Sequence, residues 1–154
     1  MAKFTGAGAA AAANSTAANA GIIQLAQGAT VKPLKLYEWE FSPAANAEDS
    51  NYLLSLSRAT TKGTWTTTVT PAALDGQSAV ASGASCFCAS TVAGTPVSNS
   101  ILLEAGCNQR AGYRWVAVPG GEFMVAPTTL FNIFLSYLFV QGTAVNNGSM
   151  SWDE

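Results

Sequence analysis

Apolar and polar residues alternate with a period of two along most of the chain after residue 20, and this pattern predicts β-strands. The clearest stretch is residues 34–41, where Leu34, Leu36, Glu38 and Glu40 alternate with Lys35, Tyr37, Trp39 and Phe41. Further strands are expected over residues 21–27, 51–60, 64–70, 84–90, 98–106, 112–118 and 122–125. Residues 130–141 are apolar on both faces, which predicts a strand that is central in a sandwich or covered by another subunit.

Gly, Pro and Asn residues mark where these strands end. The stretch 108–122 contains Pro119, Gly120 and Gly121, which predict a tight reversal, with residues 122–125 returning as the partner strand of a hairpin. The triplet at 146–148, Asn-Asn-Gly, predicts another reversal before a last edge strand over residues 149–152.

Nine or ten short strands with turn signals at intervals of roughly 8 to 12 residues predict an all-β, antiparallel two-sheet sandwich. Among such folds we favour the jelly roll, because so many strands in one unit pack most simply as two sheets. Residues 21–154 are expected to form this single domain. Residues 1–20, rich in Ala, are expected to form an extended arm, either ordered by a partner or left as an untethered tail. Phe4 is the arm's one aromatic residue and its candidate contact.

Hydrophobic residues make up 49% of the chain and charged residues 10%, against about 25% charged residues in an ordinary soluble domain. This composition is typical of chains whose surface faces other subunits. The seven Lys and Arg residues are scattered, which argues against nucleic-acid binding. No apolar run approaches the roughly 20 residues of a membrane-spanning helix, and the N-terminus lacks the apolar core of a signal peptide. We therefore expect that the protein does not associate with a membrane and that it is made in a cytoplasm.

The chain has no histidine, so Ser-His and Cys-His nucleophiles and histidine metal ligands are excluded. Three cysteines, Cys86, Cys88 and Cys107, fall short of four zinc ligands and are expected to be reduced, buried thiols. Glu38 and Glu40 have the spacing of a carboxylate pair for glycoside hydrolysis, or of the solvated face of a strand. We expect no enzymatic activity, no metal and no cofactor.

Two further groups of side chains have a structural and a functional interpretation. Arg110, Arg114, Glu104 and Glu122 are expected to form ion pairs that set strand register, or to contact a partner subunit. The aromatic residues Tyr37, Trp39, Trp65 and Trp115 are expected to pack in the core or at an interface, or else to form a sugar-stacking platform.

Three short blocks, Asn108–Ala111, Arg114–Ala117 and Pro119–Glu122, resemble small virion proteins encoded near the head genes of tailed bacteriophages, the capsid decoration or cement proteins. Residues 21–24, 37–41 and 69–75 fit the same resemblance, which covers most of the chain after residue 20. It implies a structural protein on the capsid exterior that binds the major capsid protein. On this hypothesis the chain is a homotrimer.

The candidate subunit or capsid contacts are Phe4, Arg110, Arg114, Trp115 and Glu122. The alternative function is a carbohydrate-binding or host-attachment module on the virion surface.

Overall fold

The computed structural model describes residues 2–11, 20–27, 33–45, 47, 49, 51–59, 64–75, 82–92, 96–108, 110–125, 132–139 and 145–154. These residues contain strands and no helix, so the all-β prediction is confirmed. The strands are β1 (Lys3–Ala11), β2 (Ala20–Gln27), β3 (Leu34–Ala45), β4 (Asn51–Ala59), β5 (Thr64–Val69), β6 (Ala72–Ala73), β7 (Ala84–Val92), β8 (Pro96–Asn108), β9 (Tyr113–Val116), β10 (Phe123–Val125), β11 (Asn132–Phe139) and β12 (Val145–Asp153).

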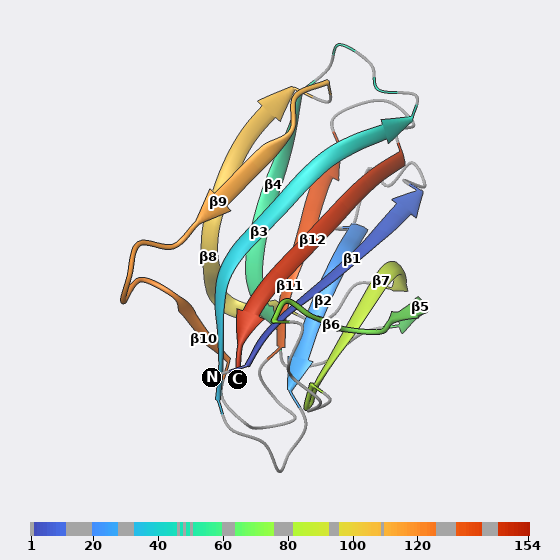
Figure 1. Ribbon diagram of the computed structural model, residues 1–154. Helices are drawn as coiled ribbons and strands as arrows, with labels where there is room; N and C mark the ends of the chain where they lie inside the picture. The colour runs from blue at the N-terminus through green and yellow to red at the C-terminus, as the bar shows by residue number, and fades with distance from the viewer. Residues whose placement is uncertain are drawn as a thin grey trace.

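Two antiparallel sheets face each other, as Figure 1 shows. In sheet A the order is β10-β3-β12-β1-β6, with β9 also pairing with β3; in sheet B it is β5-β7-β2-β11-β4-β8. The chain crosses between the sheets at each step from β1 to β4, and again from β8 to β9, from β10 to β11 and from β11 to β12. Sequence-distant strands thus become neighbours in both sheets, which is the strand order of a jelly roll. The predicted sandwich is confirmed.

A jelly roll has eight strands, and here β9 and β10 together take the place of one of them. Strands β5, β6 and β7 are additional to these eight and lie in sequence between β4 and β8. β6 extends sheet A beside β1, and β7 and β5 extend sheet B beside β2. β6 lies between the expected strands 64–70 and 84–90, where the sequence predicted no strand. This insertion widens both sheets on one side, and β6 pairs with β1 at Phe4 and Thr5, on the side of β1 away from β12.

The predicted arm is wrong for residues 3–11, because they form β1 between β12 and β6. Its alternation places Phe4, Gly6 and Gly8 inward and leaves Ala7 and Ala9 exposed or half-exposed on the outside. Phe4 is 2% exposed and stacks on Trp152, with ring centroids 6.2 Å apart. Poor β-propensity in an Ala-rich segment is overridden here by pairing with β12 along the whole segment. Residues 12–19 of the expected arm lie outside the described residues.

The reversal predicted at residues 146–148 is also wrong. β12 runs straight through these residues, with Asn147 opposite Ala9 and Gly148 opposite Gly8, and it is a central strand between β1 and β3. Gly148 is needed for space: a Cβ at this position would lie 2.7 Å from a methyl group of Ile22. The glycine marks a close approach of the two sheets, not a turn.

Gly6 and Gly8 on β1 are also needed for space, because β1 lies close to β7. A Cβ on Gly6 would lie 2.7 Å from Sγ of Cys86, and one on Gly8 would lie 2.5 Å from Cys88. Cys86 and Cys88 are buried thiols without a disulfide, as expected. Burial, with a contribution from Cys88, raises the pKa of Cys86 to about 12, so the thiol stays protonated and packs as a small apolar group.

A register shift in β3 changes which residues face the core. The pairing with β12 moves from Glu38–Ser151 to Leu36–Trp152, so Tyr37 is an extra residue on β3. Before this bulge Leu34 and Leu36 are buried, and after it Trp39 and Phe41 are buried. A strand with strict alternation would place one of these two pairs in solvent.

The two ends of the chain meet at one end of the sandwich (Figure 1). Ala2 and Glu154 exchange backbone hydrogen bonds of 3.0 and 3.3 Å. The Glu154 carboxylate reaches across to sheet B and accepts hydrogen bonds from Ser82 Oγ at 2.5 Å, Gly83 N at 2.8 Å and Ala84 N at 3.0 Å, and from Trp152 Nε1 at 3.1 Å. Nothing in the sequence pattern indicated this link between β12 and β7.

Candidate functional site

The stretch 113–125 forms one edge of sheet A, and it is not the hairpin that the sequence predicted. β9 pairs with residues 38–41 of β3 and β10 pairs with residues 34–36, both antiparallel. The two segments therefore follow each other along the same side of β3. Residues 117–122 leave the ladder between them and return to it, as a loop that projects beyond the sheet edge (Figure 1). We call residues 117–122 the edge loop.

The edge loop contains a well-defined β-turn. Gly121 N donates a 2.8 Å hydrogen bond to Val118 O, and Gly120 has a φ of 86°. Proline at the second position and a glycine with positive φ at the third are the requirements of a type II turn. At the start of the loop, Ala117 N donates to Tyr37 O at 2.8 Å, which anchors it at the bulge in β3. The predicted turn is therefore present, but it does not bring a partner strand back.

Glu122 holds the turn closed from the other side. Its Oε1 accepts a 3.1 Å hydrogen bond from Gly120 N. Hydrogen bonds from its own amide and from Gly120, with a weaker effect of the nearby Lys35, hold the pKa of Glu122 below its ordinary value. Within its own chain this carboxylate stabilises the edge loop and does not pair with Arg110 or Arg114, and its contact with a partner subunit stays a prediction.

Apolar side chains are exposed along this edge. Val118 is 73% exposed, Val116 52% and Met124 48%. Val116 pairs with Glu38, and Met124 with Lys35, on the solvent side of sheet A. We call Val116 and Met124, together with Val118 at the loop, the apolar edge. Large exposed apolar side chains gathered on one structural element are typical of protein contact sites.

Arg114 borders the apolar edge and forms an ion pair with Glu38, with Nε 2.5 Å from Oε1. The hydrogen bond and charge of Glu38 raise the pKa of Arg114 further above its usual value. The predicted pairing of Arg114 with Glu104 or Glu122 is wrong, because Arg114 pairs with Glu38 on β3. Glu104 instead accepts a 3.2 Å hydrogen bond from Ser55 Oγ on the neighbouring strand of sheet B. The Arg114 side chain is 63% exposed, so solvent screens the pair and it is expected to add little to stability.

Trp115 and Arg110 differ in how much surface they offer. Trp115 is half-buried and stacks on Phe123, with centroids 4.7 Å apart and planes at 18°, so it connects β9 to β10 across the loop. Arg110 is exposed in the turn before β9, where its backbone N donates a 2.9 Å hydrogen bond to Asn108 Oδ1. Phe4 lies in the core and has no surface to present. Of the predicted contacts, Arg110 and Arg114 are exposed, Trp115 and Glu122 are partly exposed, and Arg114 is the arginine beside the apolar edge.

The three tryptophans do not form a sugar-stacking platform. Trp39 is 1% exposed and stacks on Tyr113 at 5.1 Å, inside the sandwich. Trp115 belongs to sheet A, and Trp65 lies on β5 at the edge of sheet B next to β7. The core interpretation is correct for Trp39.

The carboxylates Glu38 and Glu40 lie on the solvent side of β3, as expected for the solvated face of a strand. Glu38 forms an ion pair with Arg114. Among the described residues no group of three or more His, Cys, Asp or Glu side chains is placed to hold a metal ion. The described residues also contain no helix long and apolar enough to span a membrane.

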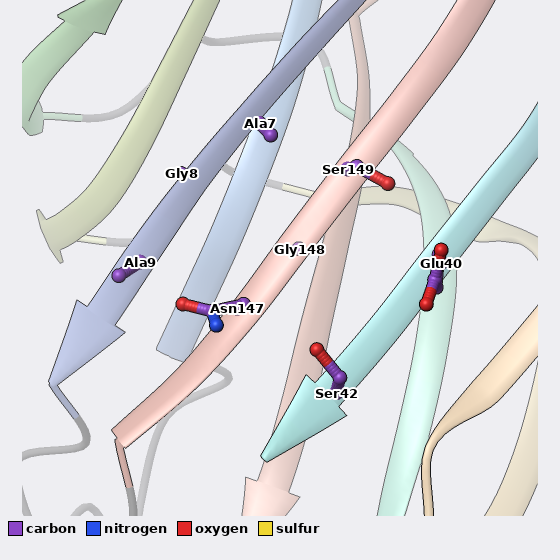
Figure 2. A pocket seen from close by; sticks show the side chains of 8 residues that line it. All are labelled: Ala7, Gly8, Ala9, Glu40, Ser42, Asn147, Gly148 and Ser149. Carbon is purple, nitrogen blue, oxygen red and sulfur yellow. The ribbon is translucent and has the colours of Figure 1, made fainter. Parts of the chain in front are cut away.

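A hollow of about 400 Å³ lies on the outer face of sheet A, over β1, β12 and β3. It is lined by Ala7, Gly8, Ala9, Glu40, Ser42, Asn147, Gly148 and Ser149. Figure 2 shows these short side chains spread over three adjacent strands, with Glu40 and Asn147 as the largest of them. We call this feature the sheet hollow. The sequence could not indicate it, because its lining comes from three distant segments.

No family model matches the chain, and no curated protein matches it. Among solved structures, a chain of the infectious bursal disease virus Gt strain is similar over 97% of this chain and 39% of its own length, with 9% sequence identity and a TM-score of 0.18. The chain thus spans well under half of that viral chain. A similarity this low bears on neither the fold nor the function.

Proposed function

We propose that this chain is a structural virion protein that decorates a bacteriophage capsid and stabilises it by binding the major capsid protein lattice from outside, as a homotrimer. The apolar edge carries the proposal. It exposes Val116 on β9, Met124 on β10 and Val118 on the loop between them, and among the described residues no further strand of sheet A pairs with β9 or β10 on this side. Such an edge is energetically costly in an isolated protein and is expected to be covered in an assembly.

The surroundings of this edge support the proposal. Arg114 lies at its border, and arginine at the margin of an apolar contact is common in protein interfaces. The chain as a whole has only 10% charged residues, so little of its surface is specialised for bulk water. A contact of roughly 800 Å² per partner is sufficient for a specific interface, and repetition over a shell would add avidity.

The test is to mix the purified protein with undecorated phage heads and to image the particles by cryo-electron microscopy. We expect regular density at symmetric positions of the lattice. Heads that remain bare at saturating protein would contradict the proposal.

Two variants examine the surface itself. The double variant V116D/M124D should weaken binding to heads at least about tenfold, because it places charges in the buried centre of the contact. The matched control is L74D, which changes an equally exposed apolar residue, 52% exposed, that follows β6 on the opposite side of sheet A. Equal losses in both variants would remove the apolar edge from the contact.

A further inference from the structure

We propose that Ser82, Gly83, Ala84 and the indole of Trp152 form a binding site for carboxylates. The Glu154 side chain of the same chain occupies this site, and an external carboxylate takes its place when that side chain is removed or outcompeted. We call the four donor residues the carboxylate nest. The site goes beyond capsid binding, because none of its residues belongs to the apolar edge and its test needs no shell.

The carboxylate nest is assembled from both sheets. Ser82 and Gly83 precede β7 and Ala84 begins it in sheet B, whereas Trp152 lies on β12 in sheet A. Oε1 of Glu154 accepts hydrogen bonds from Ser82 Oγ at 2.5 Å, Ala84 N at 3.0 Å and Trp152 Nε1 at 3.1 Å. Oε2 accepts one from Gly83 N at 2.8 Å. Both oxygens are thus held, two of the donors being successive backbone N–H groups, as in the concave sites that bind anions.

Contacts that do not involve Glu154 hold the donors in place. The Ser82 hydroxyl accepts a 3.1 Å hydrogen bond from Ala84 N, and Ala84 pairs with Gln27 in the ladder between β7 and β2. Trp152 is 0% exposed, and its ring stacks on Phe4 in the core. We therefore expect the nest to keep its shape when its present occupant is absent.

The donors select an ionised carboxylate. Burial by itself would raise the pKa of Glu154, but the hydrogen bonds from Ser82, Gly83, Trp152 and Ala84 hold it below its ordinary value of 4.5. Hydrogen bonds to a charged acceptor are roughly twice as strong as those between neutral groups. An amide offers one accepting oxygen where a carboxylate offers two, so a neutral ligand leaves part of the nest unpaired.

An external carboxylate can reach the nest and gains from entering it. Ser82, Gly83 and Glu154 are half-buried, so the site borders solvent. Without the Glu154 carboxylate, Trp152 Nε1 would be a buried donor that has lost its acceptor, which is unfavourable. In the wild type the tethered Glu154 side chain has a high effective concentration at the site. Dilute external carboxylates therefore compete poorly with it, and the ligand must be presented at high local concentration.

The test is chemical rescue of E154A by acetate, which supplies the atoms that the substitution removes. At pH 7 acetate should shift the NMR signals of the Trp152 indole N–H and the Gly83 amide in E154A, and the shifts should saturate with a dissociation constant of about 1 to 100 mM. Sodium chloride at the same ionic strength should not produce them. Wild-type protein should need at least about tenfold more acetate, because its nest is filled.

Two further variants identify the site. E154Q is the matched control: its amide oxygen still fills part of the nest, so it should also need at least about tenfold more acetate than E154A. S82A/E154A lacks one donor and should bind acetate at least about fivefold more weakly than E154A.

The proposal is overturned if E154A shows no saturable shift up to about 1 M acetate, or if E154A and wild type respond alike, which would place the binding elsewhere. Should E154A be unfolded in chloride, acetate must restore the folded spectrum, and failure to do so rejects the site as well. None of these outcomes bears on binding to phage heads, so the capsid proposal stands or falls separately.

Discussion

Glu154 shows how one side chain can join the two sheets. It is half-buried, and its carboxylate accepts hydrogen bonds from Ser82, Gly83, Ala84 and Trp152. Burial alone would raise its pKa, but these hydrogen bonds outweigh it, so the pKa lies below its ordinary value of 4.5. The ionised form is therefore the one that the folded protein prefers.

Replacing Glu154 by Gln should lower the free energy of unfolding by about 1 to 2 kcal/mol at pH 7, because one oxygen that accepts hydrogen bonds is replaced by a donor. Since the folded-state pKa is lowered, the contribution of Glu154 is complete above its unfolded-state pKa and is lost as the pH falls through the folded-state value. Urea unfolding at a series of pH values should show wild type and E154Q converging in acid. D75N, at an exposed carboxylate, is the control and should change stability by less than about 0.5 kcal/mol.

Gly6 depends on a different constraint, the space between β1 and β7. In Gly6→Ala the new Cβ would meet Cys86 Sγ at 2.7 Å, so the sheets must move apart locally. We expect a loss of about 1 to 3 kcal/mol in the free energy of unfolding, measured with denaturant. Removing the sulfur in G6A/C86A should recover part of it, with a coupling free energy of at least about 0.5 kcal/mol. Strict additivity of the two substitutions would show that crowding at Cys86 is not the cause.

The β9–β10 segment shows why a correctly located turn led to the wrong element. Two-residue hairpins need type I′ or II′ turns, which require positive φ at the first central residue. Pro119 occupies that position and holds φ near −65°, so the turn is type II and the strands on either side diverge. The same residues that indicate a turn therefore exclude the tight hairpin, and β10 continues along β3 beyond the loop.

Deleting residues 118–122 should leave a folded domain. Ala117, bonded to Tyr37 O, would then connect directly to Phe123, which already pairs with Leu36. β9 and β10 would become one continuous edge strand. Circular dichroism should retain the β-sheet signal, and the change in stability should be about 1 kcal/mol or less, because little buried area is removed. A variant that no longer folds would show that the loop is part of the core structure.

The pairing of β1 with β12 determines how the domain responds to truncation. β1 hydrogen-bonds to β12 along its whole length and pairs with β6 at Phe4 and Thr5, and Phe4 fills the core beside Trp152. Removing β1 would therefore open the edge of β12 and leave a cavity in place of Phe4.

Removal of residues 2–11 should therefore abolish cooperative thermal unfolding or make the protein insoluble. If residues 2–11 were a dispensable arm, the truncated protein would keep an unchanged unfolding transition. The milder variant Phe4→Ala should fold but lose about 3 to 5 kcal/mol, because it truncates a large buried aromatic side chain.

The sequence by itself determined the class of fold. Period-two alternation and turn signals require strands and not helices, and their number requires two sheets. The absence of histidine excludes the commonest catalytic and metal-binding arrangements at any distance along the chain. These conclusions depend on local geometry and on composition, which need no knowledge of partners.

Only the tertiary structure decided which strands pair and where surfaces form. Residues 3–11 became a strand because β12 and β6 lie on either side of them, and Gly148 became a close-contact residue because Ile22 faces it. Arg114 forms an ion pair with Glu38, which is 76 residues away in sequence. The sheet hollow is built from β1, β3 and β12. Each of these features depends on contacts between distant segments, and alternation along one segment does not record which partner it will meet.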